Sequence, residues 1–303
     1  GVYIMDGACP LLIGNAVLSN KGGGALIAGR SAPILIANKV RGNGQVGVNV
    51  KEQARPLIQN NEISENSEGG LLAEGQSRTE VQGGSVENNA GRAGLCVREE
   101  ATLRVSHCTV LAGPDGRQRA GVLLVDEAKA VVESCTVKGH RAGNVVMADS
   151  SVGALMDNVL VGGGVGLKLD GQASATVRHN TVREGEVANV LLVGQAQLRA
   201  TDNTLCGAGG AGVRVQGELC ILTGNRITDN SEAGVWVEGA GRAEMQLNCV
   251  SGNGGGGVHI ANARTKLRSN LVYRNRGVGL TLECPGAPVV EGNTVVAGPG
   301  AGV

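Results

Sequence analysis

Carboxylates are the chemistry-bearing groups that recur most regularly in this sequence. Twelve of its 27 acidic residues stand just after a short apolar segment that returns about every 23 residues: Asp6, Glu52, Glu74, Glu99, Glu100, Asp126, Glu127, Asp149, Asp170, Glu218, Glu238 and Glu283. Stacked on one edge, the group around Glu99 and Asp126 could bind a divalent cation. Like charges about 5 Å apart repel, so the edge could equally be a solvated corner or a rail for a basic partner. We predict no defined metal site and leave cation binding at this edge open.

The four histidines do not form a catalytic cluster in the sequence pattern. His107 and His179 share a place in the repeat but lie three repeats apart, roughly 14 Å by the strand spacing. His140 falls in a turn and His259 in the apolar segment, so all four are expected to be surface polar residues. No Ser/His/Asp arrangement, phosphate-binding glycine loop or HExxH motif is present. The sequence therefore predicts no catalytic residue and no cofactor.

Cysteine usage points to a reducing compartment. Eight cysteines are present without a CxxC pair, which excludes zinc-ribbon spacing. Cys108 and Cys135 share a place in neighbouring repeats, so their Cα atoms should lie about 5 Å apart, within disulfide range. We expect two stacked free thiols there and a cytoplasmic or otherwise intracellular location. The chain begins at Gly1 rather than Met, and we expect it to be a fragment of a longer protein.

These groups must be positioned by a repeat that covers the whole chain. A small residue followed by alternating apolar residues starts at Gly1, Gly24, Gly47, Gly70, Gly94, Gly121, Gly143, Gly166, Asn189, Gly212, Gly234, Gly257, Gly279 and Gly302. The intervals are 22 to 24 residues, apart from one of 27 between Gly94 and Gly121. Regular short periods of this kind are typical of solenoids, which predicts one domain over residues 1–303.

A column of asparagines forms a second landmark in the repeat. It consists of Asn15, Asn38, Asn61, Asn158, Asn180, Asn203, Asn225, Asn248, Asn270 and Asn293, with Gly84, Cys108 and Cys135 in the remaining places. An apolar residue stands two positions after each and three positions before it. Each repeat thus holds three short strands, and a stacked asparagine column can form an amide ladder.

The fold class follows from this spacing and from composition. A leucine-rich repeat would need a further leucine and room for a helix, and neither is present. The sequence therefore predicts an all-β, right-handed parallel β-helix of about 13 coils of 22–24 residues with three short strands each. Its 51 glycines, seven prolines and 42% apolar residues exclude collagen and disorder. Zero net charge and the lack of a long apolar run favour neither nucleic acid nor a membrane as partner.

Two segments carry a resemblance to known families. Pro33-Ile-Leu-Ile-Ala-Asn38 and Pro56-Leu-Ile-Gln-Asn-Asn61 resemble the right-handed β-helix repeats of carbohydrate-binding and sugar-hydrolase type. Among relatives the pattern looks most like the β-helix region of eukaryotic F-box substrate receptors. The resemblance implies that enzymes of this type would work on the outer face of the first strand, with clustered carboxylates. The outward column expected for that strand holds none: Tyr3, Leu26, Asn49, Leu72, Cys96, Leu123, Val145, Lys168, Leu191, Arg214, Trp236, His259 and Thr281.

Apolar residues on the outer faces are the candidate protein-binding sites. Leu72, Cys96, Leu123 and Val145 are expected to form an outward ladder on adjacent strands, which is unusual for an exposed surface. The one substantial insertion lies beside this ladder and carries Arg117 and Arg119, although it could equally be a tolerated surface loop. A second patch comprises Leu11, Ile34 and Leu57.

The function expected from these features is non-catalytic. We predict a protein-interaction scaffold or substrate-receptor β-helix in an intracellular protein, because the outer face of the first strand lacks carboxylates and the chain has only three Trp or Tyr residues. Its partners would be proteins, with no nucleic acid, membrane or carbohydrate expected. The alternatives are a polysaccharide-active or carbohydrate-binding β-helix and a purely structural rod in a large complex.

Overall fold

The computed structural model describes residues 1–113, 119–239, 241–261, 265–283, 288–296 and 298. In these residues the chain forms 39 short strands, three in each repeat, and no helix. It therefore contains no helix that could cross a membrane. The chain divides into two compact units, which we call unit 1 (residues 1–154) and unit 2 (residues 155–303). The expectation of one domain over the whole chain stays a prediction.

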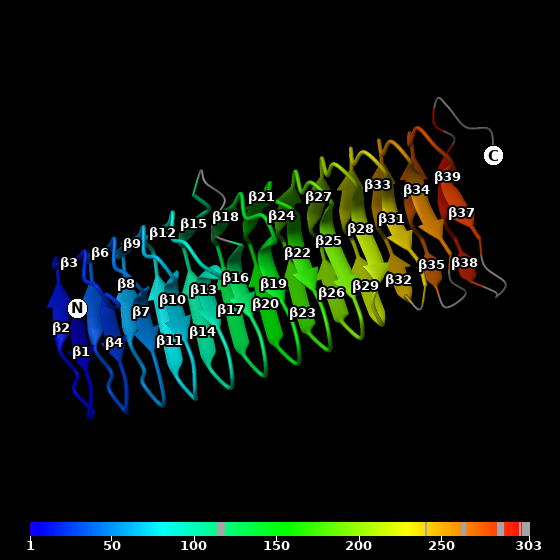
Figure 1. Cartoon of the computed structure of the whole chain (residues 1–303). Helices are drawn as coiled ribbons and strands as arrows, with labels where there is room; N and C mark the ends of the chain where they lie inside the picture. Colours follow the sequence, from blue (N-terminus) through cyan, green and yellow to red (C-terminus); the bar gives the residue numbers. More distant parts are fainter. Residues whose placement is uncertain (114–118, 240, 262–264, 284–287, 297, 299–303) are drawn as a thin grey trace. The chain divides into compact units, whose positions relative to one another are not determined.

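Unit 1 contains three parallel sheets, called A, B and C, in which each strand pairs with its equivalent one repeat later (Figure 1). Sheet A holds β1 (Val2–Ile4), β4 (Ala25–Ile27), β7 (Val46–Val50), β10 (Gly69–Ala73), β13 (Ala93–Val97), β16 (Ala120–Leu124) and β19 (Gly143–Met147). Sheet B holds β2 (Leu11–Ile13), β5 (Ile34–Ile36), β8 (Leu57–Gln59), β11 (Arg78–Gln82), β14 (Thr102–Ser106) and β17 (Lys129–Glu133), and the chain then runs through β20 (Val152–Met156). Sheet C holds β3 (Ala16–Leu18), β6 (Lys39–Arg41), β9 (Glu62–Ser64), β12 (Ser85–Glu87), β15 (Thr109–Leu111) and β18 (Thr136–Lys138).

Unit 2 repeats the same three-sheet arrangement. Its sheet A holds β22 (Val165–Leu169), β25 (Ala188–Val193), β28 (Ala211–Gln216), β31 (Ala233–Val237), β34 (Gly256–Ile260) and β37 (Leu280–Leu282). Its sheet B holds β23 (Ser174–Arg178), β26 (Gln197–Thr201), β29 (Leu219–Thr223), β32 (Ala243–Gln246), β35 (Lys266–Arg268) and β38 (Val289–Glu291). Its sheet C holds β21 (Val159–Val161), β24 (Thr181–Arg183), β27 (Thr204–Cys206), β30 (Arg226–Thr228), β33 (Cys249–Ser251), β36 (Leu271–Tyr273) and β39 (Thr294–Val296).

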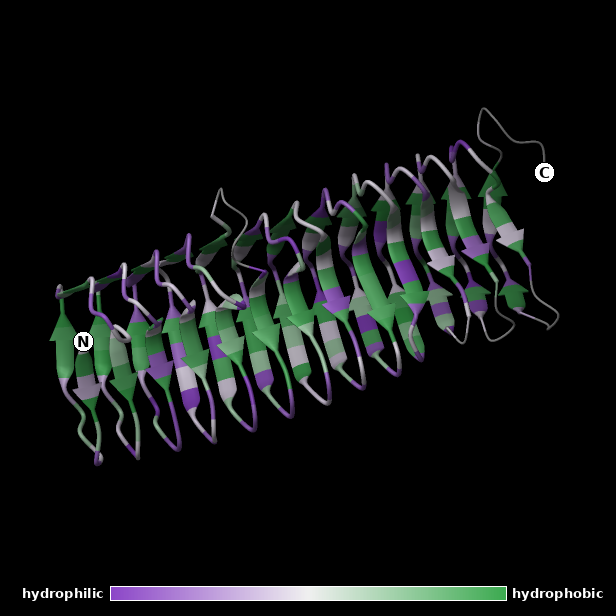
Figure 2. Ribbon diagram, viewed as in Figure 1, coloured by the Kyte–Doolittle hydropathy of each residue, from purple (hydrophilic) through white to green (hydrophobic). Residues whose placement is uncertain are grey.

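Alternation along each strand builds the core from small aliphatic residues. In β13, Leu95 and Val97 are fully buried while Cys96 between them is half-buried on the outer face. Figure 2 shows the hydrophobic residues concentrated along the strands. The glycine that precedes the inward residue allows the sheets to approach closely, since a Cβ on Gly70 would stand 2.5 Å from Val86 Cγ1. This close approach explains both the recurrent glycine and a core built without Phe.

The predicted asparagine ladder is confirmed in both units. In unit 1, the backbone N–H and the side-chain Nδ2 of Asn15 both donate to Asn38 Oδ1, at 2.8 and 2.9 Å, and Asn38 donates in the same way to Asn61. In unit 2 the same pattern runs from Asn158 to Asn293. Each ladder amide thus satisfies a buried backbone group as well as its neighbour, which fixes the stacking register.

A second asparagine ladder lies five residues further along the repeat and was not predicted. In unit 1 it joins Asn20, Asn43, Asn66 and Asn89, with Nδ2 to Oδ1 distances of 2.8, 2.8 and 2.9 Å. In unit 2 it joins Asn230, Asn253 and Asn275 at 2.9 Å per step. These residues stand among Gly and Ser in polar turns, where an asparagine is typical of ordinary turn chemistry. The sequence signal was their constant offset from the first column.

One residue of the predicted outward ladder points the other way. Val145 is fully buried, and the outward residue beside Leu123 is Val146. The prediction aligned Gly143 with Gly121, whereas the sheet pairs Gly143 with Ala120. Because side chains alternate with a period of two, this slip of one residue turned the predicted face inside out. Leu72, Cys96 and Leu123 do lie in one outward row, each half-buried.

Candidate functional site

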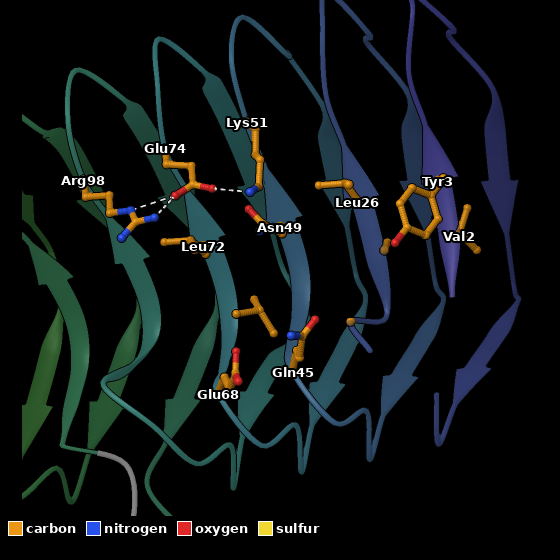
Figure 3. A pocket seen from close by; sticks show the side chains of 13 residues that line it. Val2, Tyr3, Leu26, Gln45, Asn49, Lys51, Glu68, Leu72, Glu74 and Arg98 are labelled. Carbon is orange, nitrogen blue, oxygen red and sulfur yellow. Dashed lines mark hydrogen bonds and ion pairs between the residues drawn. The ribbon is translucent and has the colours of Figure 1, made fainter. Parts of the chain in front are cut away.

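The outer face of sheet A in unit 1 carries a hollow of about 300 Å³. Tyr3, Leu26, Asn49 and Leu72 come from four neighbouring strands, β1, β4, β7 and β10, and form its floor (Figure 3). Gln45 and Glu68 line one side, and Lys51, Glu74 and Arg98 line the other. We call this hollow the unit 1 pocket. Its length follows the stacking direction of the strands, so an extended ligand could lie along it.

A buried carboxylate between two cations forms one wall of the unit 1 pocket. Glu74 follows β10 and its side chain is only 8% exposed, whereas Lys51 and Arg98 follow β7 and β13 and are each 42% exposed. Lys51 Nζ lies 3.0 Å from Glu74 Oε1, and Arg98 donates from Nε and from a terminal nitrogen to Oε2 (Figure 3). Burial would raise the pKa of Glu74, but these hydrogen bonds and charges outweigh it and hold the pKa below its ordinary value. Glu74 is therefore an ionised group that positions two cations toward the pocket.

The floor of the unit 1 pocket offers an acceptor and an aromatic ring. Asn49 Oδ1 is buried and has no hydrogen-bond partner among the described residues. An unpaired buried carbonyl is costly, so a ligand hydroxyl that donated to it would gain from the pairing. Tyr3 is 72% exposed at the end of the pocket away from Arg98 (Figure 3). The pocket thus combines amides, cations and a phenol ring, the side chains that recognise polar ligands with some apolar surface.

The outer face of sheet A in unit 2 carries a different cluster, which we call the unit 2 row. Arg214, Trp236 and His259 stand side by side on β28, β31 and β34. The Trp236 and His259 ring centroids are 4.7 Å apart, and Arg214 Cζ lies 5.7 Å from the Trp236 ring centre. Arg214 Nε donates to Glu238 Oε1 at 2.7 Å, and His259 Nε2 lies 3.7 Å from Glu283 Oε2.

The electrostatics of the unit 2 row differ from those of the unit 1 pocket. Burial acts to raise the pKa of Glu238, but hydrogen bonds from Arg214 and Gln216 prevail and hold that pKa below its usual range. Its side chain is 25% exposed, three times the exposure of Glu74. The row therefore presents stacked planar groups that are flanked by ionised carboxylates.

Sequence reasoning named several of these residues without connecting them. Trp236, His259 and Arg214 were placed correctly in the outward column, and their neighbouring repeats were the signal that they would touch. The burial of Glu74 was missed, because its position looks the same as those of the solvated turn acids. Lys51 and Asn49 carry no local motif, and only the stacking brings them to Glu74 and Leu26.

The predicted protein-binding residues are distributed over several places. Leu72 lines the unit 1 pocket, and burial raises the pKa of the half-buried Cys96 thiol. Arg119 is exposed, and Arg117 lies outside the described residues. The patch on sheet B is exposed at Leu11 (59%) and Ile34 (38%) and half-buried at Leu57. Their role in binding a protein stays a prediction.

One histidine and the acidic edge depart from expectation. His140 is fully buried rather than on the surface, because it occupies a place in the second asparagine column, and its Nδ1 lies 3.1 Å from Asn144 Oδ1. Along the acidic edge, Asp149 accepts the Asp126 N–H and Asp126 accepts the Glu99 N–H, at 3.1 and 2.9 Å. The edge thus stabilises left-handed corners, and within the described residues no group of three metal-ligating side chains is arranged to hold an ion.

Solved structures with the same architecture are similar over nearly the whole chain. A mannuronan C-5 epimerase A-module (AlgE6) from Azotobacter vinelandii shares 14% identity at a TM-score of 0.61, covering 97% of this chain and 92% of its own. A double mutant of the periplasmic alginate epimerase AlgG shares 13% identity at the same TM-score, covering 90% and 78%. Among curated protein sequences, none matches significantly.

These neighbours correct the functional expectation. The prediction of a non-enzymatic interaction scaffold is wrong, because the solved proteins that share the fold are epimerases of alginate or mannuronan. The intracellular assignment is contradicted as well, since one of them is periplasmic. It rested on free thiols, and Cys108 and Cys135 are free thiols that lie buried, so they report little about the compartment. No comparison supports the finer likeness to F-box receptors.

The family itself follows from the sequence match. Residues 23–182 and 188–303 match the family described as "Right handed beta helix region". This match covers most of the repeats and agrees with the three parallel sheets of each unit. The predicted right-handed parallel β-helix is confirmed, and the chain belongs to the right-handed β-helix family.

Proposed function

We propose that this chain is a polysaccharide-active β-helix that binds an acidic polysaccharide in the unit 1 pocket. The observation that carries the proposal is the pairing of Lys51 and Arg98 around one buried carboxylate beside an extended hollow. Two cations against the single charge of Glu74 leave a positive excess on that wall, which suits the carboxylate of a uronate. The epimerases with the same fold act on alginate or mannuronan, whose sugars are uronates.

The floor of the pocket supports a sugar rather than a simple anion. Asn49 Oδ1 can accept a hydrogen bond from a sugar hydroxyl, and Gln45 adds a second amide. Leu26 and Leu72 provide apolar contact for the C–H groups of a pyranose ring. A linear polymer that lay across β1 to β10 would meet this set in order, one strand after another.

The chemistry that this wall favours is proton removal next to a carboxylate. Lys51 and Arg98 would stabilise the negative charge that develops on a uronate when the proton on the adjacent carbon leaves. Glu74 stays ionised and is committed to both cations, so its role is to hold them. Epimerisation and β-elimination of a uronate both begin with this proton transfer.

Calorimetric titration with mannuronate oligomers tests binding, with a neutral mannose oligomer as the reference ligand. We expect the acidic oligomer alone to bind and Arg98→Gln to weaken it about tenfold, or about 1.4 kcal/mol. The matched control is Arg104→Gln, since Arg104 lies on sheet B and is an exposed partner of Glu133. Equal affinity for the neutral oligomer, or equal loss in both variants, would contradict the proposal.

Activity is tested separately by proton exchange. Polymannuronate and polygalacturonate are incubated with the protein in deuterium oxide, and proton NMR follows the signal of the carbon-bound hydrogen beside the carboxylate. We expect this signal to decline with one of the two polymers and to persist in Arg98→Gln. Binding without any exchange would reduce the proposal to recognition of the polymer.

A further inference from the structure

The unit 2 row is held together by contacts between its own members on an outward face. Trp236 stands between the Arg214 guanidinium and the His259 ring, at 5.7 and 4.7 Å between centres. All three are only partly buried, so they contribute little to the aliphatic core beneath them. Cation–π and ring contacts at such exposed sites stabilise by about 0.5–1 kcal/mol each, which orders the side chains.

The edges of the stacked groups form a defined pattern of polar and apolar contacts. The indole presents an apolar edge with one N–H donor, and it is flanked by N–H groups of Arg214 and by the imidazole of His259. Among the described residues, the hydrogen bonds of Arg214 engage its Nε alone, with Glu238. Its terminal nitrogens therefore remain able to donate to a ligand.

Carboxylates complete the pattern on the next outward positions of the same strands. Glu238 lies beside Arg214 and Gln216, both of which donate to its Oε1 at 2.7 Å. Glu283 is 66% exposed, and its Oε2 lies 3.7 Å from His259 Nε2. Each carboxylate has oxygen lone pairs left for hydroxyl donors. Donors, acceptors and an apolar ring thus lie within the span of three adjacent strands.

We propose that Arg214, Trp236 and His259 form a second saccharide-binding site, which takes a uronate. Arg214 would bind the sugar carboxylate through its terminal nitrogens, Trp236 would contact the ring C–H groups, and His259 with Glu238 would hydrogen-bond the hydroxyls. The ligand class rests on the proposed function, whereas the site is separate from the unit 1 pocket. An extended acidic polymer would therefore meet a recognition site in each unit.

Trp236 makes this site directly observable because it is the only tryptophan in the chain. Its fluorescence emission is followed while mannuronate oligomers are added, with the neutral mannose oligomer as reference and calorimetry run in parallel. We expect a saturable change with the acidic oligomer alone. Arg214→Gln should weaken the affinity read from Trp236 at least about tenfold. His259→Gln serves as the second variant if Arg214→Gln fails to fold.

Two controls separate this inference from the proposed function. Arg98→Gln, in the unit 1 pocket, should leave the Trp236-reported affinity unchanged. Arg268→Gln removes an exposed arginine of unit 2 that pairs with Glu291 on sheet B and should also change nothing. Calorimetric binding with unaltered Trp236 emission would overturn the second site and leave the proposed function standing. Absence of both heat and emission change would overturn both, and an equal emission change with the neutral oligomer would overturn the uronate assignment.

Discussion

Unit 1 and unit 2 use the same repeat but differ in how they fill its asparagine corner. The first ladder of unit 2 runs unbroken from Asn158 to Asn293, whereas that of unit 1 gives way to Gly84, Cys108 and Cys135. There the Cys108 N–H donates to Cys135 Sγ at 3.4 Å, a weaker bond than the amide bonds of the ladder. The corner therefore tolerates replacement where a small group can still stack.

The outer faces of sheet A differ in a parallel way. The unit 1 pocket buries one carboxylate between two cations, while the unit 2 row exposes its carboxylates and stacks an aromatic ring between Arg214 and His259. The strand spacing is the same in both, so it sets where side chains meet and leaves their chemistry to the sequence. A β-helix can thus place unrelated sites at equivalent positions of its coils.

The largest effect is expected from breaking the continuous ladder. Asn180 Nδ2 donates to Asn203 Oδ1, Leu155 O and Arg178 O, and its Oδ1 accepts from Asn158. Asn180→Leu leaves several of these buried groups unpaired, so we expect a loss of about 4 kcal/mol in the free energy of unfolding. Chemical denaturation measures it, with Cys108→Ala in unit 1 as the comparison at about 1 kcal/mol. Equal losses would show that the two corners are energetically alike.

Sequence reasoning captured what periodicity controls. The three strands per repeat, the asparagine column and most of the outward residues of sheet A followed from fixed offsets, since stacking copies each position into the next coil. Val145 failed because an adjacent glycine made a repeat of 22 residues look equivalent to one of 23. A local irregularity of one residue is enough to reverse a face.

The candidate sites were less accessible to sequence reasoning. Glu74 looks like any other turn acid until Lys51 and Arg98, 23 and 24 residues away, are seen to enclose it. The absence of carboxylates from the outward column was read as an absence of chemistry, although the cations at its margin carry the functional argument. Charge pairing between coils depends on side-chain reach, which no short motif encodes.

A smaller and pH-dependent effect is expected at His140 in unit 1. Burial lowers its pKa to about 4, although the hydrogen bond with Asn144 opposes the shift. The unfolded chain therefore binds the proton more readily than the folded one, and stability falls as pH drops from about 6.5 toward 4, by at most about 3 kcal/mol.

Replacing His140 with the residue typical of its column tests this assignment. His140→Asn should restore the second ladder contact and flatten the stability profile over that pH range, while stability at neutral pH changes little. Thermal melts of both proteins across the range measure it, with His107→Asn as the exposed control. An unchanged acid dependence in His140→Asn would place the acid sensitivity in other groups.

The smallest effect compares the two carboxylates that the units treat differently. Glu74→Gln should cost about 2 kcal/mol, because it leaves Lys51 and Arg98 without their buried counter-charge, whereas Glu238→Gln should cost less than about 1 kcal/mol at its more exposed site. Both pKa values are held below normal in the folded state, so each contribution is present above the unfolded pKa of about 4.3 and is lost as pH falls through the folded value. Melting temperatures of both variants at neutral and acidic pH measure the difference, which should narrow in acid as the wild-type carboxylates become protonated. A Glu238→Gln loss as large as that of Glu74→Gln would mean that exposure does not distinguish the two outer faces, and the contrast between a buried charge in unit 1 and a solvated one in unit 2 would fall with it.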